Sequence, residues 1–145
     1  PGTTAAPYLS VETPQTGDLR APQRPRVTDS ATYLNEHLHR VPVMLIPCLE
    51  GKPLDTPSGQ SAGFWGSLLP AVWSFMLALR SRGLGSAWTT LHLLGDGEKQ
   101  AADILGIPFD NYSQAGLFPI AYTKGTDFRR ATRPPAEQPT PWDPW

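Results

Sequence analysis

Residues 61–90, SAGFWGSLLPAVWSFMLALRSRGLGSAWTT, decide the fold of this 145-residue chain. The first part of the stretch predicts a helix over residues 61–82 that is apolar on nearly every side. A helix of this kind belongs inside a large core or in a subunit interface. Pro70 is expected to kink or divide the helix, because proline removes one backbone hydrogen bond and crowds the preceding turn. The apolar run 62–79 approaches membrane length, but its proline, serines and flanking glycines favour an interior helix of a soluble protein.

The exit from this helix is as specific as its interior. Gly83 stands where a left-handed C-terminal cap is expected. Residues 86–90 then predict a short strand that ends in Trp-Thr-Thr. A helix that leads into a strand ending in small hydroxyl residues is a suitable place to hold a planar cofactor.

The composition limits the partners and the compartment. The net charge is −1 and the isoelectric point is about 6.3, so no basic surface for nucleic acid or an anionic membrane is expected. The one cysteine, Cys48, excludes an internal disulfide framework and fits a reducing compartment. We therefore expect a cytoplasmic protein that binds neither nucleic acid nor membrane. We interpret Cys48 as a small buried side chain in a strand.

The remaining segments predict an α+β or three-layer α/β arrangement. Residues 1–27 are rich in proline and are expected to be irregular. A helix over residues 28–39 is expected to begin at Thr28 or Asp29. Continuous apolar runs predict buried strands at 41–49 and at 114–122, the latter bent by Pro119. Between them lie a loop at 50–58 and a helix over 98–105, capped by Asp96 and ended by Gly106.

Four segments together resemble the FMN-dependent nitroreductase family. They are ALRSRGLGSAWTT (78–90), AADILGIPFD (101–110), GLFPIAY (116–122) and FRRATRPP (128–135), and they follow the family's order and spacing. The match is to the C-terminal two-thirds of the family and is closest to its small actinobacterial members. It covers about residues 30–135.

The resemblance implies a homodimer with a three-layer α+β fold, a central mixed sheet and a long buried helix. Two FMN molecules would lie in clefts at the dimer interface. The family passes a hydride from NADH or NADPH to flavin N5 and then reduces an acceptor such as a nitroaromatic or a quinone, in a ping-pong sequence. By this reading residues 28–135 are the C-terminal part of the domain. The Pro/Trp tail 136–145 packs on the partner subunit, which the helix over residues 61–82 also contacts.

One part of the family pattern is missing. The Arg-Ser-x-Arg type phosphate motif and the Pro-, Ser- and Asn-rich flavin segment of the family's N-terminal third have no counterpart before Tyr33. The resemblance therefore implies a chain that is incomplete at its N-terminus and cannot bind FMN tightly alone.

The resemblance assigns two cofactor contacts. Trp88, Thr89, Thr90 and Leu91 match the segment that passes the flavin ring, where a hydrogen-bond donor stabilises the charge of the reduced ring. The alternative is that the threonines are ordinary β-branched strand residues.

Arg133 matches a basic residue that contacts the FMN phosphate, and Arg130 lies close enough to share this role. Ala131 replaces a lysine that some members have. For each arginine, a solvated surface position is the alternative. His92 directly follows the flavin segment and is a candidate for the substrate side, although a lone histidine in a loop is more often a surface residue. No metal-ligand spacing is present.

Three functions are compatible with these residues. The first is an FMN-dependent NAD(P)H oxidoreductase of the nitroreductase type. The second is a flavin-storing or flavin-sensing protein of the same fold, and the third is a non-catalytic remnant that dimerises through the long helix and the tail. The residues do not distinguish NADH from NADPH, or FMN from a deazaflavin.

Overall fold

The structure, a computed structural model, describes residues 21–53, 58–128, 130, 133, 135–137 and 140. The chain forms two compact units, one of residues 38–125 and one of residues 1–37 with 126–145. The tail tryptophans, Trp142 and Trp145, lie outside the described residues, and so does Arg129.

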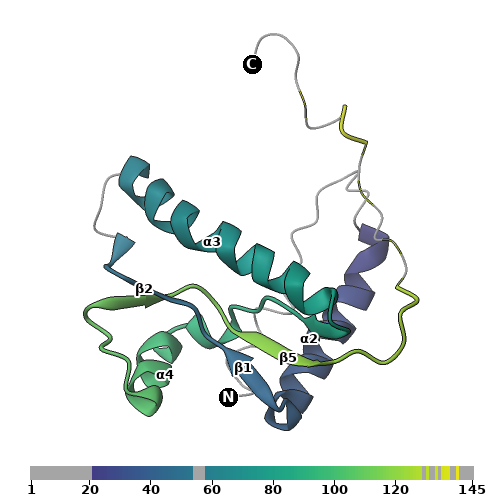
Figure 1. Ribbon diagram of the computed structural model, residues 1–145, viewed down its shortest axis with the longest axis horizontal. Coiled ribbons are helices and arrows are strands. Elements are labelled where there is room, and N and C mark those ends of the chain that lie inside the picture. The colour runs from purple at the N-terminus through teal and green to yellow at the C-terminus, as the bar shows by residue number, and fades with distance from the viewer. Residues whose placement is uncertain are drawn as a thin grey trace. The chain divides into compact units, whose positions relative to one another are not determined.

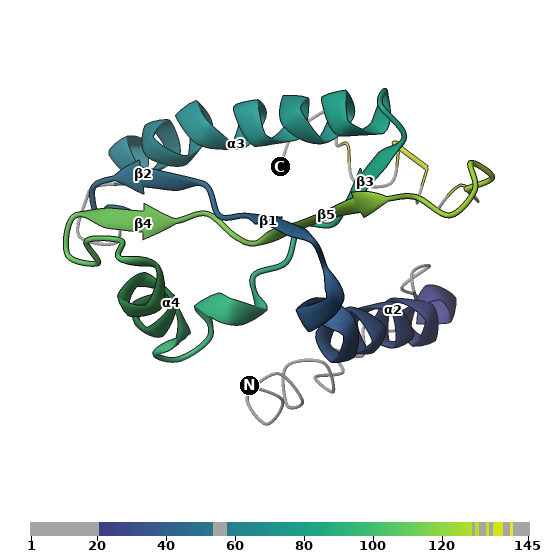
Figure 2. The same cartoon turned by 60° about the horizontal axis from the view of Figure 1, so that its bottom comes forward.

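The larger unit contains two small antiparallel sheets. In the first sheet β5 (Phe118–Tyr122) lies between β1 (Val43–Leu45) and β3 (Leu84–Ser86), and in the second β2 (Cys48–Glu50) pairs with β4 (Tyr112–Gln114). Helix α3 (Ser58–Arg80) lies on one side of the strands, and α4 (Gly97–Leu105) lies on the other (Figures 1 and 2). The expected α+β class is confirmed. The expected central mixed sheet is wrong, because every pair among the described strands is antiparallel.

Each of the two long strands expected from the sequence is divided between the two sheets. The run 41–49 forms β1 and β2, which are separated by Ile46 and Pro47. In the run 114–122, β4 ends at Gln114 and β5 begins at Phe118. Gly116, between β4 and β5, has φ 143°, which a residue with a side chain rarely adopts. The breaks therefore fall where proline and glycine interrupt the regular ladder. Val43 and Met44, which point to opposite faces of β1, are both exposed, which corrects the expectation of a strand covered on both faces.

Helix α3 is one uninterrupted helix that contains Pro70, so the proline does not divide it. It ends at Arg80, and Gly83 has the left-handed conformation expected of it, with φ 74°. Only Val72 and Leu79 are buried in α3, whereas Trp73 is 60% exposed and Leu77 is 56% exposed. The helix is therefore not an interior helix of this chain, and the other expectation, a subunit interface, stays a prediction. Val72 and Leu79 are two turns apart, so one stripe of α3 packs on the unit and the other sides do not.

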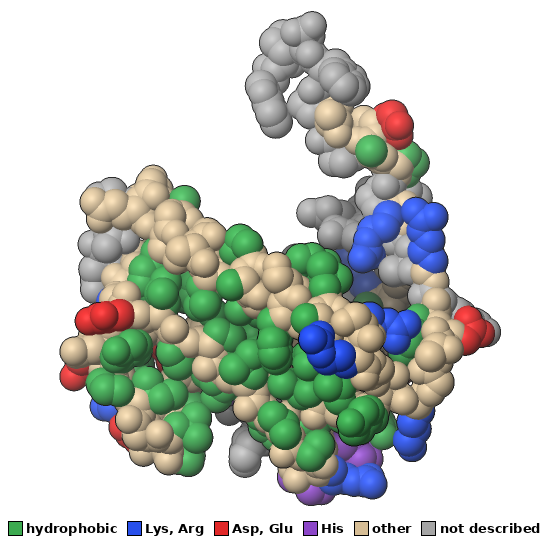
Figure 3. All heavy atoms as spheres, in the orientation of Figure 1, with side chains coloured by type: hydrophobic (Ala, Val, Ile, Leu, Met, Phe, Trp, Pro, Cys, Tyr) green, Lys and Arg blue, Asp and Glu red, His purple; other side chains and the backbone are tan. Residues whose placement is uncertain are grey.

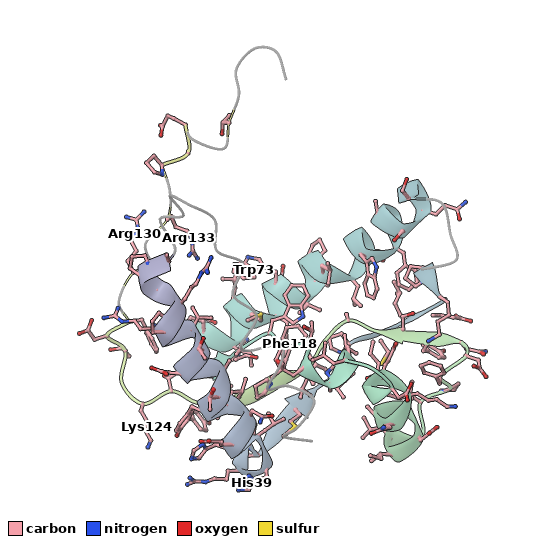
Figure 4. All side chains as sticks on the ribbon, turned by 180° about the vertical axis from the view of Figure 1, so that it is seen from behind. His39, Trp73, Phe118, Lys124, Arg130 and Arg133 are labelled. Carbon is pink, nitrogen blue, oxygen red and sulfur yellow. The ribbon has the colours of Figure 1, made fainter. Side chains whose placement is uncertain are left out.

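The exposed side of α3 carries two large apolar side chains, Trp73 and Leu77, among small residues and serines. Figure 3 shows hydrophobic side chains gathered along the helix, and Trp73 projects from its side away from the strands (Figure 4). By length and composition α3 is the one described helix that could cross a membrane, but core helices of soluble proteins pass the same test.

The core of the larger unit lies around β5 and the connection that precedes it. Phe118 is fully buried, as is Ala102 on α4. Ala115 and Leu117 are nearly so, and the polar residues Ser113 and Gln114 are buried beside them. The segment 113–119 is thus the most completely enclosed stretch of the described chain.

The two shorter helices follow the expected signals in part. Helix α2 (Arg24–His37), in the smaller unit, begins earlier than Thr28, with Pro25 in its first turn, where the missing N–H costs nothing. It is preceded by η1 (Ala21–Gln23), and in the larger unit the chain continues as η2 (Leu38–Arg40). Helix α4 has Asp96 at its N-cap position, without a side-chain capping bond, and Gly106 at a left-handed C-cap with φ 69°.

Candidate functional site

The candidate flavin segment begins where the ladder between β3 and β5 is interrupted. Ser86 pairs with Ile120, and three residues further along the chain Thr89 pairs with Leu117 in the same register. In that register Ala87 lies opposite Pro119, which has no N–H to donate. The regular strand therefore stops at Ser86. The expected strand over residues 86–90 is wrong, because Pro119 on the neighbouring strand ends the ladder.

The same register fixes which way the backbone groups point. The N–H groups of Leu117 and Thr123 donate to Thr89 and Gly83, so the odd-numbered residues of β5 face β3. Since β3 is the last of the described strands in its sheet, the backbone groups of Ser86 and Trp88 point to the side on which no described strand lies. This side presents backbone hydrogen-bond donors beside the interrupted ladder.

Trp88 is held in one orientation but remains 46% exposed. Its indole Nε1 donates a hydrogen bond to the carbonyl of Ala115 at 3.0 Å, and its ring lies 5.6 Å from the ring of Phe118. A Cβ at position 116 would clash with the indole nitrogen, so Gly116 is needed at this contact. One part of the indole is thus fixed to the core, and the rest offers an apolar surface.

The two threonines differ in what their hydroxyl groups do. Thr89 is tied to Leu117 by two backbone hydrogen bonds, and its Oγ1 accepts a hydrogen bond from the N–H of Leu91 at 3.3 Å. Thr90 is exposed and precedes η4 (Leu91–Leu93) without a side-chain capping bond. Thr89 therefore shapes the turn, whereas the hydroxyl of Thr90 is directed to no capping partner.

His92, in η4, lies in a polar network that the sequence did not reveal. Its Nε2 is 3.1 Å from Oε1 of Gln114, whose Nε2 donates to the carbonyl of Glu98 at 2.9 Å. The carboxylate of Glu98 accepts the backbone N–H of Gln114 at 2.9 Å and lies 3.9 Å from Nζ of Lys52. Burial lowers the pKa of His92, against smaller opposing effects of the Gln114 hydrogen bond and the Glu98 charge.

Two buried polar atoms flank the candidate segment without a hydrogen-bond partner within the part of the chain that the structure describes. They are Oγ of Ser86 and Nδ1 of His92. Buried polar atoms of folded proteins are nearly always paired, so such atoms call for a donor or acceptor from elsewhere. Together with the open side of β3, they make residues 86–92 the candidate site.

The candidate phosphate residues belong to the other unit. Arg130 and Arg133 are both exposed, among residues 126–145. Their contact with a phosphate stays a prediction, as do the roles of Trp88, Thr89, Thr90 and Leu91 at the flavin ring.

Sequence reasoning missed Gln114, Glu98 and Lys52. Lys52 donates to the carbonyl of Tyr112 at 2.6 Å and lies 4.0 Å from the centre of the Phe109 ring. A polar residue at the end of an otherwise apolar run, as Gln114 is, was the available signal. Among the described residues no group of three or more His, Cys, Asp or Glu could hold a metal ion.

Comparison with known proteins gives one family. The family model described as nitroreductase family matches residues 6–122, which is more than half of the chain. The match includes the candidate segment and His92, begins earlier than the resemblance noted above, and ends before Arg130 and Arg133. No curated protein matches the chain. The chain therefore belongs to the nitroreductase family, and membership indicates an oxidoreductase of the flavin-dependent kind.

Proposed function

We propose that this protein is an FMN-dependent NAD(P)H oxidoreductase that reduces a nitroaromatic, a quinone or a similar acceptor. The proposal rests on family membership and on one structural observation. Pro119 interrupts the ladder at Ala87 and leaves backbone donors on the open side of β3, flanked by two buried polar atoms without partners.

The residues present fit a flavin in their donor set. Backbone N–H groups at Ser86 and Trp88 and the hydroxyl of Thr90 are suited to the polar edge of the ring, where charge collects on reduction. The half-exposed indole of Trp88 supplies an apolar surface. When bound, the flavin supplies hydride chemistry, and the protein supplies binding, orientation and electrostatics. Arg130 and Arg133 have the fork geometry that suits a phosphate.

The proposal includes a homodimer that buries the exposed side of α3. Large apolar side chains such as Trp73 and Leu77 are normally covered, and Val72 and Leu79 already pack α3 on its own unit. Insertion into a lipid bilayer would require the helix to leave these contacts. We therefore propose a second copy of the chain as the cover, with the C-terminal tail contributing, and a cytoplasmic location for the dimer.

The test is an FMN titration of the purified protein, followed by addition of NADH or NADPH. Quenching of flavin fluorescence on binding and loss of yellow colour with the nicotinamide are expected. Binding without bleaching would instead indicate flavin storage or sensing. No binding to this chain or to any longer form of it would contradict the flavin assignment.

Two matched variant pairs locate the binding contacts. Thr90→Val is expected to weaken FMN binding severalfold by removing the hydroxyl. Thr123→Val is the control and is expected to leave FMN binding unchanged, because the hydroxyl of Thr123 donates to Gly83.

Arg133→Ala is expected to raise the FMN dissociation constant by roughly 10- to 100-fold, because a charge-assisted bond to phosphate is lost. Arg26→Ala, in α2 of the same unit, is its control. Equal effects of the two arginine variants would indicate that Arg133 is a solvated surface residue without a contact to the phosphate.

A further inference from the structure

Gln114 is a polar residue at a buried position of a strand. It is 3% exposed, ends β4 and pairs with Cys48 of β2. Burying an amide side chain costs free energy unless its donors and acceptor are paired. The side chain of Gln114 is paired to His92 on one side and to Glu98 on the other.

The orientation of the Gln114 amide follows from its partner on α4. The carbonyl oxygen of Glu98 is an acceptor only, so the amide nitrogen of Gln114 must face it. The opposite orientation would set two oxygens against each other. Oε1 of Gln114 is therefore the atom that faces His92, and it is also an acceptor only.

The protonation of His92 follows from this orientation. Because Oε1 of Gln114 can only accept, Nε2 of His92 must carry the hydrogen. A proton on Nδ1 as well would place a cation at an atom that is buried and has no acceptor among the described residues. Neutral imidazole with its hydrogen on Nε2 is the one state that satisfies these contacts. The lowered pKa of His92 agrees with that state.

The charged groups near His92 are compensated without a positive charge on its imidazole. Glu98 faces His92 and Cys48 from α4, and its carboxylate is compensated by Lys52 and by the backbone N–H of Gln114. Desolvation and the Glu98 charge both raise the pKa of the Cys48 thiol, so that group stays neutral. No neighbour therefore requires a positive His92.

The network also fixes the backbone beside the candidate segment. A Cβ at Gly97 would clash with the carbonyl of His92, so the start of α4 packs directly on η4. The backbone N–H of Gln114, in β4, donates to the carboxylate of Glu98 in α4. Strand β4 in turn pairs with β2, so α4 and η4 are tied to both strands. Trp88 and Thr89 are held by Ala115 and Leu117, but η4 begins directly after Thr90, so the position of Thr90 and Leu91 depends on this cross-link.

We propose that Gln114 is a positioning residue: it holds His92 as the neutral Nε2–H imidazole and thereby fixes the turn that follows the Trp88–Leu91 segment. The tautomer is independent of any ligand. The consequence for flavin rests on the proposed function.

The first test is nitrogen NMR of the full chain with ¹⁵N-labelled histidine, in a His37→Gln/His39→Gln background that leaves His92 alone. A single Nε2–H tautomer is expected at pH 7. An Nδ1–H tautomer or an imidazolium at pH 7 would overturn the proposal. This measurement requires no substitution in the network.

Variants of Gln114 separate positioning from simple packing. Gln114→Glu keeps the shape but adds a negative charge, so the pKa of His92 should rise by about one unit. Gln114→Met removes the bond, and the ¹⁵N shifts and titration of His92 should change, whereas Gln100→Met on the exposed side of α4 should leave both as they are. A His92 titration identical in all forms would overturn the proposal.

A flavin titration of the same proteins tests the consequence. Gln114→Met should weaken FMN binding about tenfold relative to Gln100→Met, and equal affinities would overturn the positioning role. If the unsubstituted protein binds no flavin, the proposed function fails, while the NMR result still decides the tautomer.

Discussion

Helix α3 and the segment 112–122 are both predominantly apolar, and their burial is opposite. Residues 113–119 are buried throughout, with Phe118 fully enclosed, whereas α3 buries only Val72 and Leu79. Both stretches look like core in the sequence. The difference shows that apolar character tells which residues need a cover, but only the tertiary structure tells whether the same chain provides it.

The largest effect is expected from the enclosed stretch. Phe118→Ala should reduce the free energy of unfolding by about 3–5 kcal/mol, because it leaves a cavity that its neighbours cannot fill. Urea unfolding at fixed protein concentration measures it. The control is Tyr122→Ala on the same strand, where the side chain is 82% exposed. Similar losses for both variants would contradict the location of the core.

A smaller loss of stability is expected at the break between β4 and β5. Gly116→Ala should cost about 1–3 kcal/mol, since its φ of 143° is strained for alanine and the new methyl group clashes with Trp88. Gly125→Ala, at a positive φ but in open space, separates the two causes. If both variants lose the same stability, the contact with Trp88 contributes nothing.

The exposed side of α3 should respond in assembly rather than in folding. Trp73→Lys or Leu77→Lys is expected to raise the dimer dissociation constant at least tenfold, about 1.4 kcal/mol, because an apolar interface would then enclose a charge. Sedimentation equilibrium measures it. Ile104→Lys, at an exposed apolar position on α4, should leave the dimer intact. A protein that is monomeric without any substitution would remove the proposed interface.

The smallest effect concerns pH. Because the pKa of His92 is lowered in the folded protein, the unfolded chain binds more protons between that lowered value and about 6.5. Stability should therefore be constant above this window and fall as the pH drops through it. Urea midpoints measured from pH 8 to pH 5 should show this fall, and His92→Gln should reduce it. A midpoint that rises on acidification would contradict the sign.

Much of the local structure was predictable because its causes are local. Gly83 and Gly106 end helices, and the positive φ at each is a property that glycine brings to the sequence. The α+β class and the family followed from the order of the segments. By contrast, the end of β3 at Ser86 depends on Pro119, which lies more than thirty residues further along the chain.

The candidate site divides in the same way. Trp88, Thr89, Thr90 and Leu91 could be selected because they are adjacent in the sequence. Gln114 and Glu98 could not, since they meet His92 only through a strand pair and a helix that begins after a turn.

The sequence by itself determined the family, the helix ends and which residues need to be covered. These features depend on neighbouring residues and on side-chain chemistry. Only the tertiary structure decided the division into two antiparallel sheets, the exposure of α3 and the His92–Gln114–Glu98 network. These features depend on contacts between residues that are distant along the chain, and no local pattern specifies such contacts.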